Sequence, residues 1–145
     1  MKKALYSLLF MSILAIAPMQ SQAQCKSFTK KNCIPKLDPY VYNGQLNSAV
    51  LSEGDVAELL LTFYGGQDYR IQVCGHPALG NIQFQVFDTE NNILFDNAEN
   101  DYTKAWDFKS NSTQQLIVRV TVPQENNRSE MVQSGCVSIL VGFKE

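Results

Sequence analysis

The sequence predicts an all-β protein, an antiparallel β-sandwich of jelly-roll type with seven or eight strands and two disulfides. From residue 41 onward, apolar and polar side chains alternate with the two-residue period of half-buried strands, and turn residues separate the segments. Four cysteines follow an N-terminal segment typical of export, which indicates two disulfides in an oxidising compartment. Strands with one apolar face need a second sheet to cover that face, so a sandwich is the expected architecture.

The first element, residues 1–23, predicts a secretory signal peptide that is cleaved near Ala23. Two lysines precede an apolar run over 4–17, which is too short to span a bilayer, and small residues then lead up to the cleavage point. Cys25 leaves a lipoprotein open, although a lipid-modified cysteine normally follows a small residue and this one follows Gln24. We therefore expect a bacterial protein that is secreted, periplasmic or held at the outer cell surface.

The next segment, 24–40, is expected to be an irregular basic leader. Cleavage removes two of the twelve basic residues, so 12 − 2 = 10 remain against 14 acidic ones, a net charge of −4. An acidic body disfavours nucleic acid as a partner, because nucleic-acid binding needs a basic face. No later apolar stretch reaches membrane length, so we expect no membrane span. The leader itself carries Lys26, Lys30, Lys31 and Lys36.

Residues 41–145 are predicted to form a single sandwich domain. In segment 57–64 the odd-numbered residues are apolar, and in 116–122 the even-numbered ones are, so these positions should face the core. Asp, Asn, Gly and Pro occupy the connections, where they suit tight turns. The segments expected to form strands are 57–64, 69–74, 82–86, 93–95, 102–108, 116–122 and 136–143.

The alternation also places the cysteines. Cys74 and Cys136 both fall at strand ends on the outward face, so the register favours a Cys74–Cys136 bridge between two strands of one sheet. Cys25–Cys33 then follows by elimination and would hold the leader locally. The single histidine, His76, lies two residues after Cys74, but a nucleophile–base pair needs a free thiolate. We therefore predict no catalytic residue and no zinc site there.

The turn that contains Asp88, Glu90 and Asn92 is a candidate calcium site. It places oxygen-bearing side chains at alternate positions, whereas calcium requires six to eight oxygen ligands. The simpler interpretation is a hairpin turn, in which Asp and Asn bond their own backbone. We expect the turn, with no metal and no cofactor.

Tyr102 and Trp106 are the candidate ligand contacts. On a strand over 102–108 they would share one face, and exposed Tyr and Trp rings can stack against sugars. In a small sandwich, a single tryptophan near Phe108 is more often part of the core. We expect Trp106 in the core and retain the sugar platform as an alternative.

The run from Leu51 to Phe95 carries "LSEGD", "GGQDYRIQV" and "IQFQVFDTENNILFD". This succession of a Gly-Asp turn, a tyrosine-bearing strand and a strand–turn–strand resembles the bacterial pre-peptidase C-terminal type of domain. The resemblance implies a small jelly-roll sandwich on exported bacterial proteins, usually without catalysis and associated with secretion, adhesion or substrate contact.

Together these features predict an exported β-sandwich that binds a partner or supports an assembly in the bacterial cell envelope and is not an enzyme. The expected partner is a protein or polysaccharide of the envelope. A carbohydrate-binding module that uses an aromatic platform is the first alternative. The second is a small secreted hydrolase with a carboxylate pair, although nothing in the sequence selects such a pair.

Overall fold

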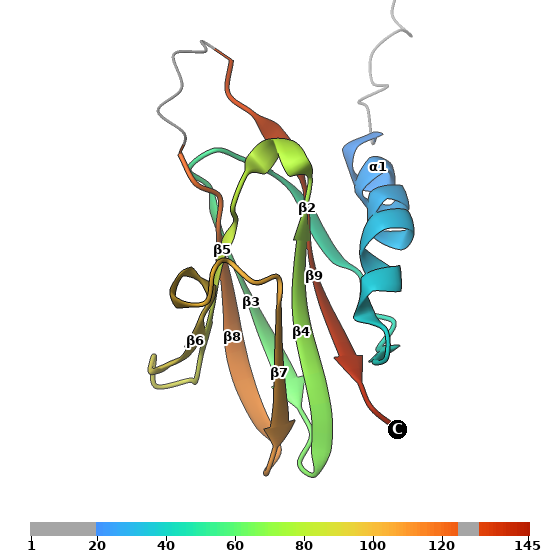
Figure 1. Cartoon of the computed structure of the whole chain (residues 1–145), viewed down its shortest axis with the longest axis vertical. Helices are drawn as coiled ribbons and strands as arrows, with labels where there is room; N and C mark the ends of the chain where they lie inside the picture. The colour runs from blue at the N-terminus through green and yellow to red at the C-terminus, as the bar shows by residue number, and fades with distance from the viewer. Residues whose placement is uncertain (1–19, 125–130) are drawn as a thin grey trace, which may run out of the picture.

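A computed structural model describes residues 20–124 and 131–145, and shows two packed β-sheets with a helical segment on the outside (Figure 1). The predicted antiparallel β-sandwich is confirmed. The helical elements are α1 (Gln20–Phe28), the π-helical η1 (Thr29–Cys33) and the 3-10 turns η2 (Ile34–Leu37), η3 (Pro77–Leu79) and η4 (Asn97–Glu99). The strands are β1 (Val41–Tyr42), β2 (Asn47–Ser52), β3 (Val56–Phe63), β4 (Gln67–Gly75), β5 (Gln83–Phe87), β6 (Ile93–Asp96), β7 (Ala105–Ser110), β8 (Gln114–Thr121) and β9 (Ser134–Phe143).

The five-stranded sheet, here sheet A, has the order β1-β9-β4-β7, with β2 also paired to β9. Because β4 occupies one edge of β9, β1 and β2 lie one after the other along its opposite edge. The four-stranded sheet, here sheet B, has the order β3-β8-β5-β6. All these pairs are antiparallel.

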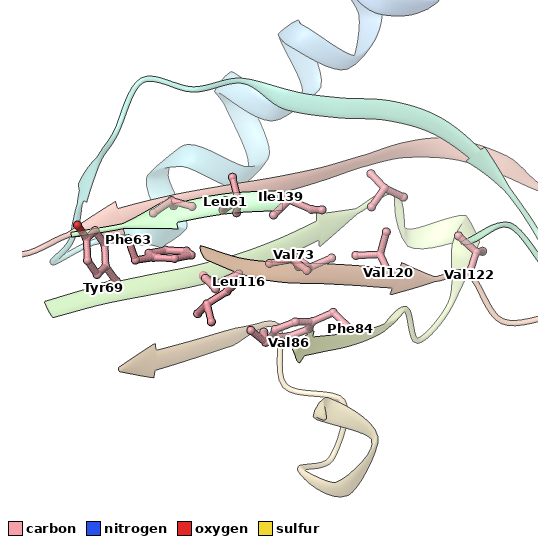
Figure 2. Close-up of a cluster of buried hydrophobic side chains, with 14 of the residues drawn as sticks. Leu61, Phe63, Tyr69, Val73, Phe84, Val86, Leu116, Val120, Val122 and Ile139 are labelled. Atoms are coloured by element: carbon pink, nitrogen blue, oxygen red, sulfur yellow. The ribbon is translucent and has the colours of Figure 1, made fainter. Parts of the chain in front are cut away.

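The core lies between the two sheets, on the faces that the alternation predicted (Figure 2). Odd-numbered residues of β3, β4 and β9 meet even-numbered residues of β5 and β8, because each strand presents alternate side chains to one face. Burying these apolar side chains is the main favourable contribution to folding. They include Leu61, Phe63, Tyr69, Val73, Phe84, Val86, Leu116, Val120, Val122 and Ile139.

The prediction of an irregular leader is wrong, because residues 20–37 form three consecutive helical elements, α1, η1 and η2. Cys25, Thr29 and Cys33 recur every four residues and form the buried face of this segment, while the leader's lysines are exposed. The leader packs across the outer face of sheet A, and its side chains Phe28 and Leu37 take part in the contact. The apolar periodicity that normally identifies a helix is weak, because two cysteines and a threonine occupy three of the buried positions.

The predicted disulfide pairing is also wrong, although all four cysteines are bonded and both strand cysteines face outward as expected. The bridges are Cys25–Cys136 and Cys33–Cys74, with Cα–Cα distances of 5.3 Å and 5.8 Å. Cys74 lies opposite Ser138 in the register, two residues from Cys136. Such diagonal neighbours lie about 7–8 Å apart, whereas a disulfide needs Cβ atoms about 4 Å apart. The leader above the sheet supplies both partners.

Buried polar groups beneath the leader are hydrogen-bonded. Thr29 Oγ1 donates to the Cys25 carbonyl at 2.7 Å, so the Ser138 hydroxyl donates to Thr29 across 2.5 Å. Gln72 Nε2 donates to the Cys33 carbonyl at 3.0 Å. These bonds remove the cost of burying polar groups and fix the position of the leader on sheet A.

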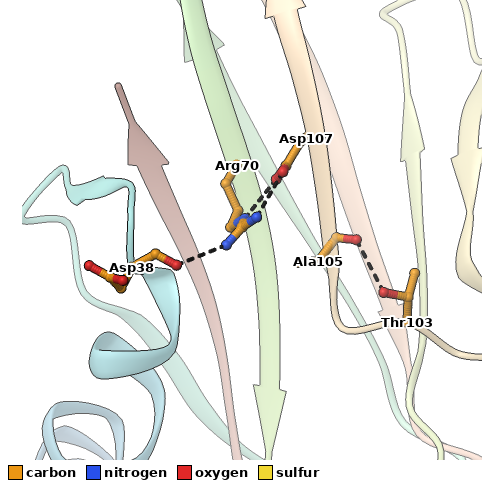
Figure 3. Close-up of polar contacts among 5 residues, drawn as sticks. All are labelled: Asp38, Arg70, Thr103, Ala105 and Asp107. Carbon is orange, nitrogen blue, oxygen red and sulfur yellow. Dashed lines mark hydrogen bonds and ion pairs between the residues drawn. The ribbon is translucent and has the colours of Figure 1, made fainter. Parts of the chain in front are cut away.

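The end of the leader is held by an arginine on β4 (Figure 3). Arg70 donates to both carboxylate oxygens of Asp107 on β7, at 2.7 Å and 2.8 Å, and to the Asp38 carbonyl at 3.3 Å. Its guanidinium also lies 4.5 Å from the centre of the Tyr40 ring. Gly142 on β9 lets Tyr40 lie close to sheet A, because a Cβ at position 142 would lie 2.7 Å from Tyr40 Cβ.

The predicted signal peptide, 1–23, falls mostly outside the described residues and stays a prediction. Helix α1 begins at Gln20, within the last part of that segment. In the described part of the chain, none of the helices has the length and apolar character needed to cross a membrane.

Candidate functional site

Three of the four edges of the two sheets carry features that discourage further pairing. The β1–β2 edge is interrupted at Gly44, which has a φ of +85°. β6 has only four residues and pairs with β5 through an irregular register. β7 exposes the charged Asp107 and Lys109.

The fourth edge, β3, has the fewest of these features. It is eight residues long, contains no proline or lysine, and leaves Val56 and Leu60 exposed at 58% and 53%. Its only charged side chain, Glu58, is paired with Arg119 of β8 at 2.5 Å. A long, apolar and uncovered edge of this kind can add another strand.

Hydrogen bonds on either side of β8 show which β3 backbone groups have no strand partner among the described residues. Val122 N donates to the Asp55 carbonyl at 2.9 Å, so the odd-numbered residues of β3 bond to β8. Phe84 N bonds Asn97 on the β6 side, at 2.8 Å, so β5 and β8 meet through their odd-numbered residues. The backbone N–H and C=O groups of the even-numbered residues of β8 therefore point to β3. The backbone groups directed away from β8 belong to Val56, Glu58, Leu60 and Thr62.

A groove runs beside β3, between it and the β1–β2 edge of sheet A. It consists of two adjoining hollows of about 660 Å³ and 320 Å³. Side chains of β3 and β9 line both, so the groove follows the open side of the sandwich. The larger hollow is lined by Asn43, Gln45, Leu60, Leu61, Thr62, Tyr64, Gly65, Gln67, Tyr69, Val141 and Phe143. The smaller is lined by Leu46, Asn47, Ser48, Ala49, Leu51, Ala57, Leu59, Val120, Val137 and Ile139.

The lining of the groove is uncharged throughout, although the chain carries 26 charged side chains (12 + 14). Its polar groups are amides, hydroxyls and phenols, which donate and accept hydrogen bonds without carrying charge. The lining also lacks histidine, cysteine, aspartate and glutamate, the residue types that most often act as acid, base or metal ligand. The groove is therefore equipped for binding an uncharged, partly apolar ligand surface.

One amide in the groove wall is unsatisfied. Nδ2 of Asn47 is buried and has no hydrogen-bond partner among the described residues. A buried donor without an acceptor costs free energy. Asn47 belongs to the lining of the smaller hollow.

The charged groups with shifted pKa values lie elsewhere. Hydrogen bonds from Arg70 lower the pKa of the Asp107 carboxyl, against the opposing effect of partial burial. At Asp96, burial raises the pKa, but hydrogen bonds from Gln83, Ala98 and Gln85 together outweigh it and the net pKa is lowered. Both carboxylates serve the fold, at β7 and β6, on the side of the sandwich opposite the groove.

The candidate calcium turn is a hydrogen-bonded hairpin turn. Asp88 Oδ1 accepts from the backbone N–H of Glu90 and of Asn92, each at 2.9 Å, and Oδ2 accepts from the Asn92 amide at 2.8 Å. These bonds lower the pKa of Asp88, with the Asn92 side chain contributing most. Among the described residues, no three side chains of His, Cys, Asp or Glu are grouped as metal ligands.

The structure does not unite Tyr102 and Trp106 on one strand face. β7 begins only at Ala105, and Tyr102 lies in the preceding turn with a φ of +52°. The Trp106 ring stacks on Phe108 and on Phe95, with centroids 4.5 Å and 5.3 Å away. Trp106 packs against the edge of the core, as expected, and its ring faces contact protein.

His76 has a local structural role. Its Nδ1 accepts the backbone N–H of Ala78 at 3.2 Å and so caps η3. Cys74, which the sequence places near it, is bonded to Cys33. The two residues therefore form no nucleophile–base pair.

None of the candidate site residues predicted from the sequence lies in the groove. One signal was visible in the strand over 57–64, where Leu60 interrupts an otherwise polar outward face. An apolar residue on the solvent side of a strand is a sign of a contact surface. Sequence alone could not show that Asn43, Gln45 and Gln67 gather beside this strand, because the first two lie in the connection between β1 and β2 and the third begins β4.

No protein-family model matches the chain, and no curated protein matches it. The resemblance to pre-peptidase C-terminal domains therefore stays a prediction. Among solved structures, the chain is similar to PliG of Aeromonas hydrophila, a periplasmic lysozyme inhibitor of g-type lysozyme. The match has a TM-score of 0.50 and 14% sequence identity, and covers 73% of this chain and 89% of PliG. At this identity the likeness shows a shared fold.

Proposed function

We propose that this chain is an exported, non-catalytic binding protein of the bacterial envelope, and that it holds a protein ligand in the groove beside β3. The observation that carries the proposal is the uncharged lining of the groove next to an uncovered strand edge. Apolar surface with scattered neutral hydrogen-bonding groups is the usual composition of the centre of a protein–protein interface.

The solved structure with a similar fold supports the same class of function. Its name describes it as an inhibitor that acts on another protein, a g-type lysozyme, and places it in the periplasm. The disulfides of the present chain agree with an oxidising compartment of that kind. A g-type lysozyme is accordingly the first ligand to test.

A second candidate is carbohydrate binding in the same groove. Tyr64, Tyr69 and Phe143 line the larger hollow together with the amides of Asn43 and Gln67. Aromatic faces and neutral amides suit sugar rings. This candidate moves the predicted sugar contacts from Tyr102 and Trp106 to the open side of the sandwich.

The test compares two identical substitutions. Gln45→Lys places a charge in the wall of the larger hollow, and Gln115→Lys places the same charge on an exposed position of β8 outside the groove. Binding to g-type lysozyme is measured by calorimetry. Inhibition of the lysozyme is measured as slower clearing of a suspension of bacterial cell walls. We expect Gln45→Lys to weaken binding at least about tenfold, or about 1.4 kcal/mol, and Gln115→Lys to leave it unchanged.

Other results would redirect the proposal. Equal binding by both variants would place the interface away from the groove. Absence of lysozyme binding, together with retention on peptidoglycan that only Gln45→Lys abolishes, would replace the protein ligand with a carbohydrate.

A further inference from the structure

The exposed edge of β3 suits a second copy of the same chain. We propose that two copies associate by antiparallel pairing of β3 with β3, about a two-fold axis at Leu60. This inference concerns a homodimer and does not depend on the identity of the groove ligand.

The free backbone groups and the sheet faces together limit the register. Even-numbered residues direct their N–H and C=O groups to the open edge, so each must lie opposite another even-numbered residue. This condition also keeps the inner face of one copy continuous with the inner face of the other, because directly opposed residues in an antiparallel pair point to the same side. A register that paired even with odd residues would turn one apolar face into solvent.

Among the even registers, the one centred on Leu60 places the apolar side chain of Leu60 at the two-fold axis and separates the two Glu58 side chains. Leu60 meets Leu60 of the second copy, and Glu58 meets Thr62 in both halves of the interface. Just beyond, the exposed side chains of Val56 and Tyr64 lie next to each other, a β-branched and aromatic pair of the kind that stabilises sheets. The backbone ladder ends at Glu58 and Thr62, because the Tyr64 N–H already bonds the Tyr69 hydroxyl at 3.1 Å.

The charge on this edge is compatible with self-pairing. Glu58 is the only charged residue of β3, and Arg119 of the same copy already neutralises it. In the proposed register the two Glu58 side chains lie opposite threonines and not opposite each other. Like charges directly opposed would destabilise the pair, and this register avoids them.

The dimer would join two four-stranded sheets into one continuous sheet of eight strands (4 + 4). It would bury part of the apolar side chains of Val56 and Leu60 against their cross-strand neighbours. It would also set the two grooves next to each other across the two-fold axis, because β3 forms one wall of each groove.

The first test is self-association of the exported, oxidised protein, measured by sedimentation from micromolar to near-millimolar concentration. We expect a monomer–dimer equilibrium. Leu60→Lys, which sets two charges face to face at the axis, should leave only monomer. The matched control is Ile93→Lys on β6, an edge strand of the same sheet, where Ile93 is 59% exposed. This control should associate like the unchanged protein.

A second variant isolates the backbone. Leu60→Pro removes an N–H that points to the free edge and none that bonds β8, so the fold tolerates it as edge strands tolerate proline. It should also be monomeric, whereas Leu60→Ala should retain part of the association. Protein that stays monomeric at all concentrations, or dimers that persist in both Leu60→Lys and Leu60→Pro, would overturn the proposal.

The register is tested by cross-linking. Leu60→Cys should form an interchain disulfide on mild oxidation, because the two side chains face each other. Thr62→Cys alone should not, but it should cross-link to Glu58→Cys when the two variants are mixed. Cross-linking of Thr62→Cys to itself would show a different register and contradict the axis at Leu60. Loss of association in Glu58→Pro, which removes a free-edge N–H at a position outside the groove lining, with unchanged ligand binding would leave the proposed function intact.

Discussion

The two long sides of the sandwich are built differently. On one side, β6 and β7 bring their edges together through Phe95 and Trp106, whose rings stack with an interplanar angle of 15°. Phe108 continues the stack along β7. On the other side, β2 and β3 face each other across an open groove.

The difference follows from the size of the side chains at the sheet edges. Large rings fill the space between β6 and β7, whereas Ala49 of β2 and Ala57 of β3 line the hollow on the other side. Where edge side chains are small, a hollow remains between two sheets that lie about 10 Å apart. The closed side thus contributes to stability, and the open side leaves room for a ligand or a second copy.

The largest expected effect is at the closed side. Trp106→Ala removes the ring that joins the two sheet edges, and we expect it to lower the free energy of unfolding by about 3 kcal/mol. Leu60→Ala on the open side should change it by less than about 0.5 kcal/mol, because Leu60 is exposed. Urea denaturation of the two variants measures both. A loss at Trp106 no greater than at Leu60 would remove the distinction between the sides.

The second largest effect is expected at Asn97, in the η4 turn between β6 and β7. Asn97 is 1% exposed; its Oδ1 accepts from Phe84 N, and its Nδ2 donates to the carbonyls of Ile82 and Thr103. Asn97→Ala leaves these buried groups without partners, and we expect a loss of about 2 kcal/mol in urea denaturation. Asn100→Ala, at an exposed neighbouring position, serves as the control and should cost clearly less.

A smaller effect is expected from the ion pair on β7. Because Arg70 lowers the pKa of folded Asp107, the pair contributes stability above the unfolded pKa of about 3.9, and this contribution disappears as pH falls through the lower folded value. The difference in unfolding free energy between the unchanged protein and Asp107→Asn should therefore be largest above about pH 5 and shrink below about pH 4. A difference that stays constant over this range would show that the pair contributes little.

The smallest effect should come from the turn between β5 and β6. Asp88→Ala removes three exposed hydrogen bonds and should destabilise the protein less than Asn97→Ala. Because the Asp88 carboxylate is already engaged, millimolar calcium should leave the melting temperature unchanged. A rise in melting temperature with calcium that Asp88→Ala abolishes would mean that the turn binds the metal.

Seven of the nine strands in the described residues, β3 to β9, could be predicted from the sequence because their information is local, whereas β1 and β2 were not among the predicted segments. Alternation placed Leu61, Val73, Val120 and Ile139 on the inner faces, and the structure has them there. The same alternation correctly set Cys74 on an outer face. It could not give the partner of Cys74, because that partner lies on a helix whose buried face contains few apolar residues.

The leader and the groove depend on relations that alternation does not contain. The spacing of Cys25, Thr29 and Cys33 is a four-residue period, the one local sign that the leader is helical and packed along one face. The groove arises only when β2 and β3 become edge strands of different sheets. Strand order is a property of the whole topology, so Asn47 and Gln45 carried no individual signal.

The two disulfides also determine what a protease can do to this molecule. Cys25–Cys136 closes a covalent ring with a sequence separation of 111, and Cys33–Cys74 closes a smaller ring of separation 41 inside it. Hydrolysis of any single peptide bond between Cys25 and Cys136 therefore opens a ring without releasing a fragment. A nicked chain keeps its full mass and separates into pieces only after reduction, so a protein exposed to envelope proteases can be cut once and remain one molecule.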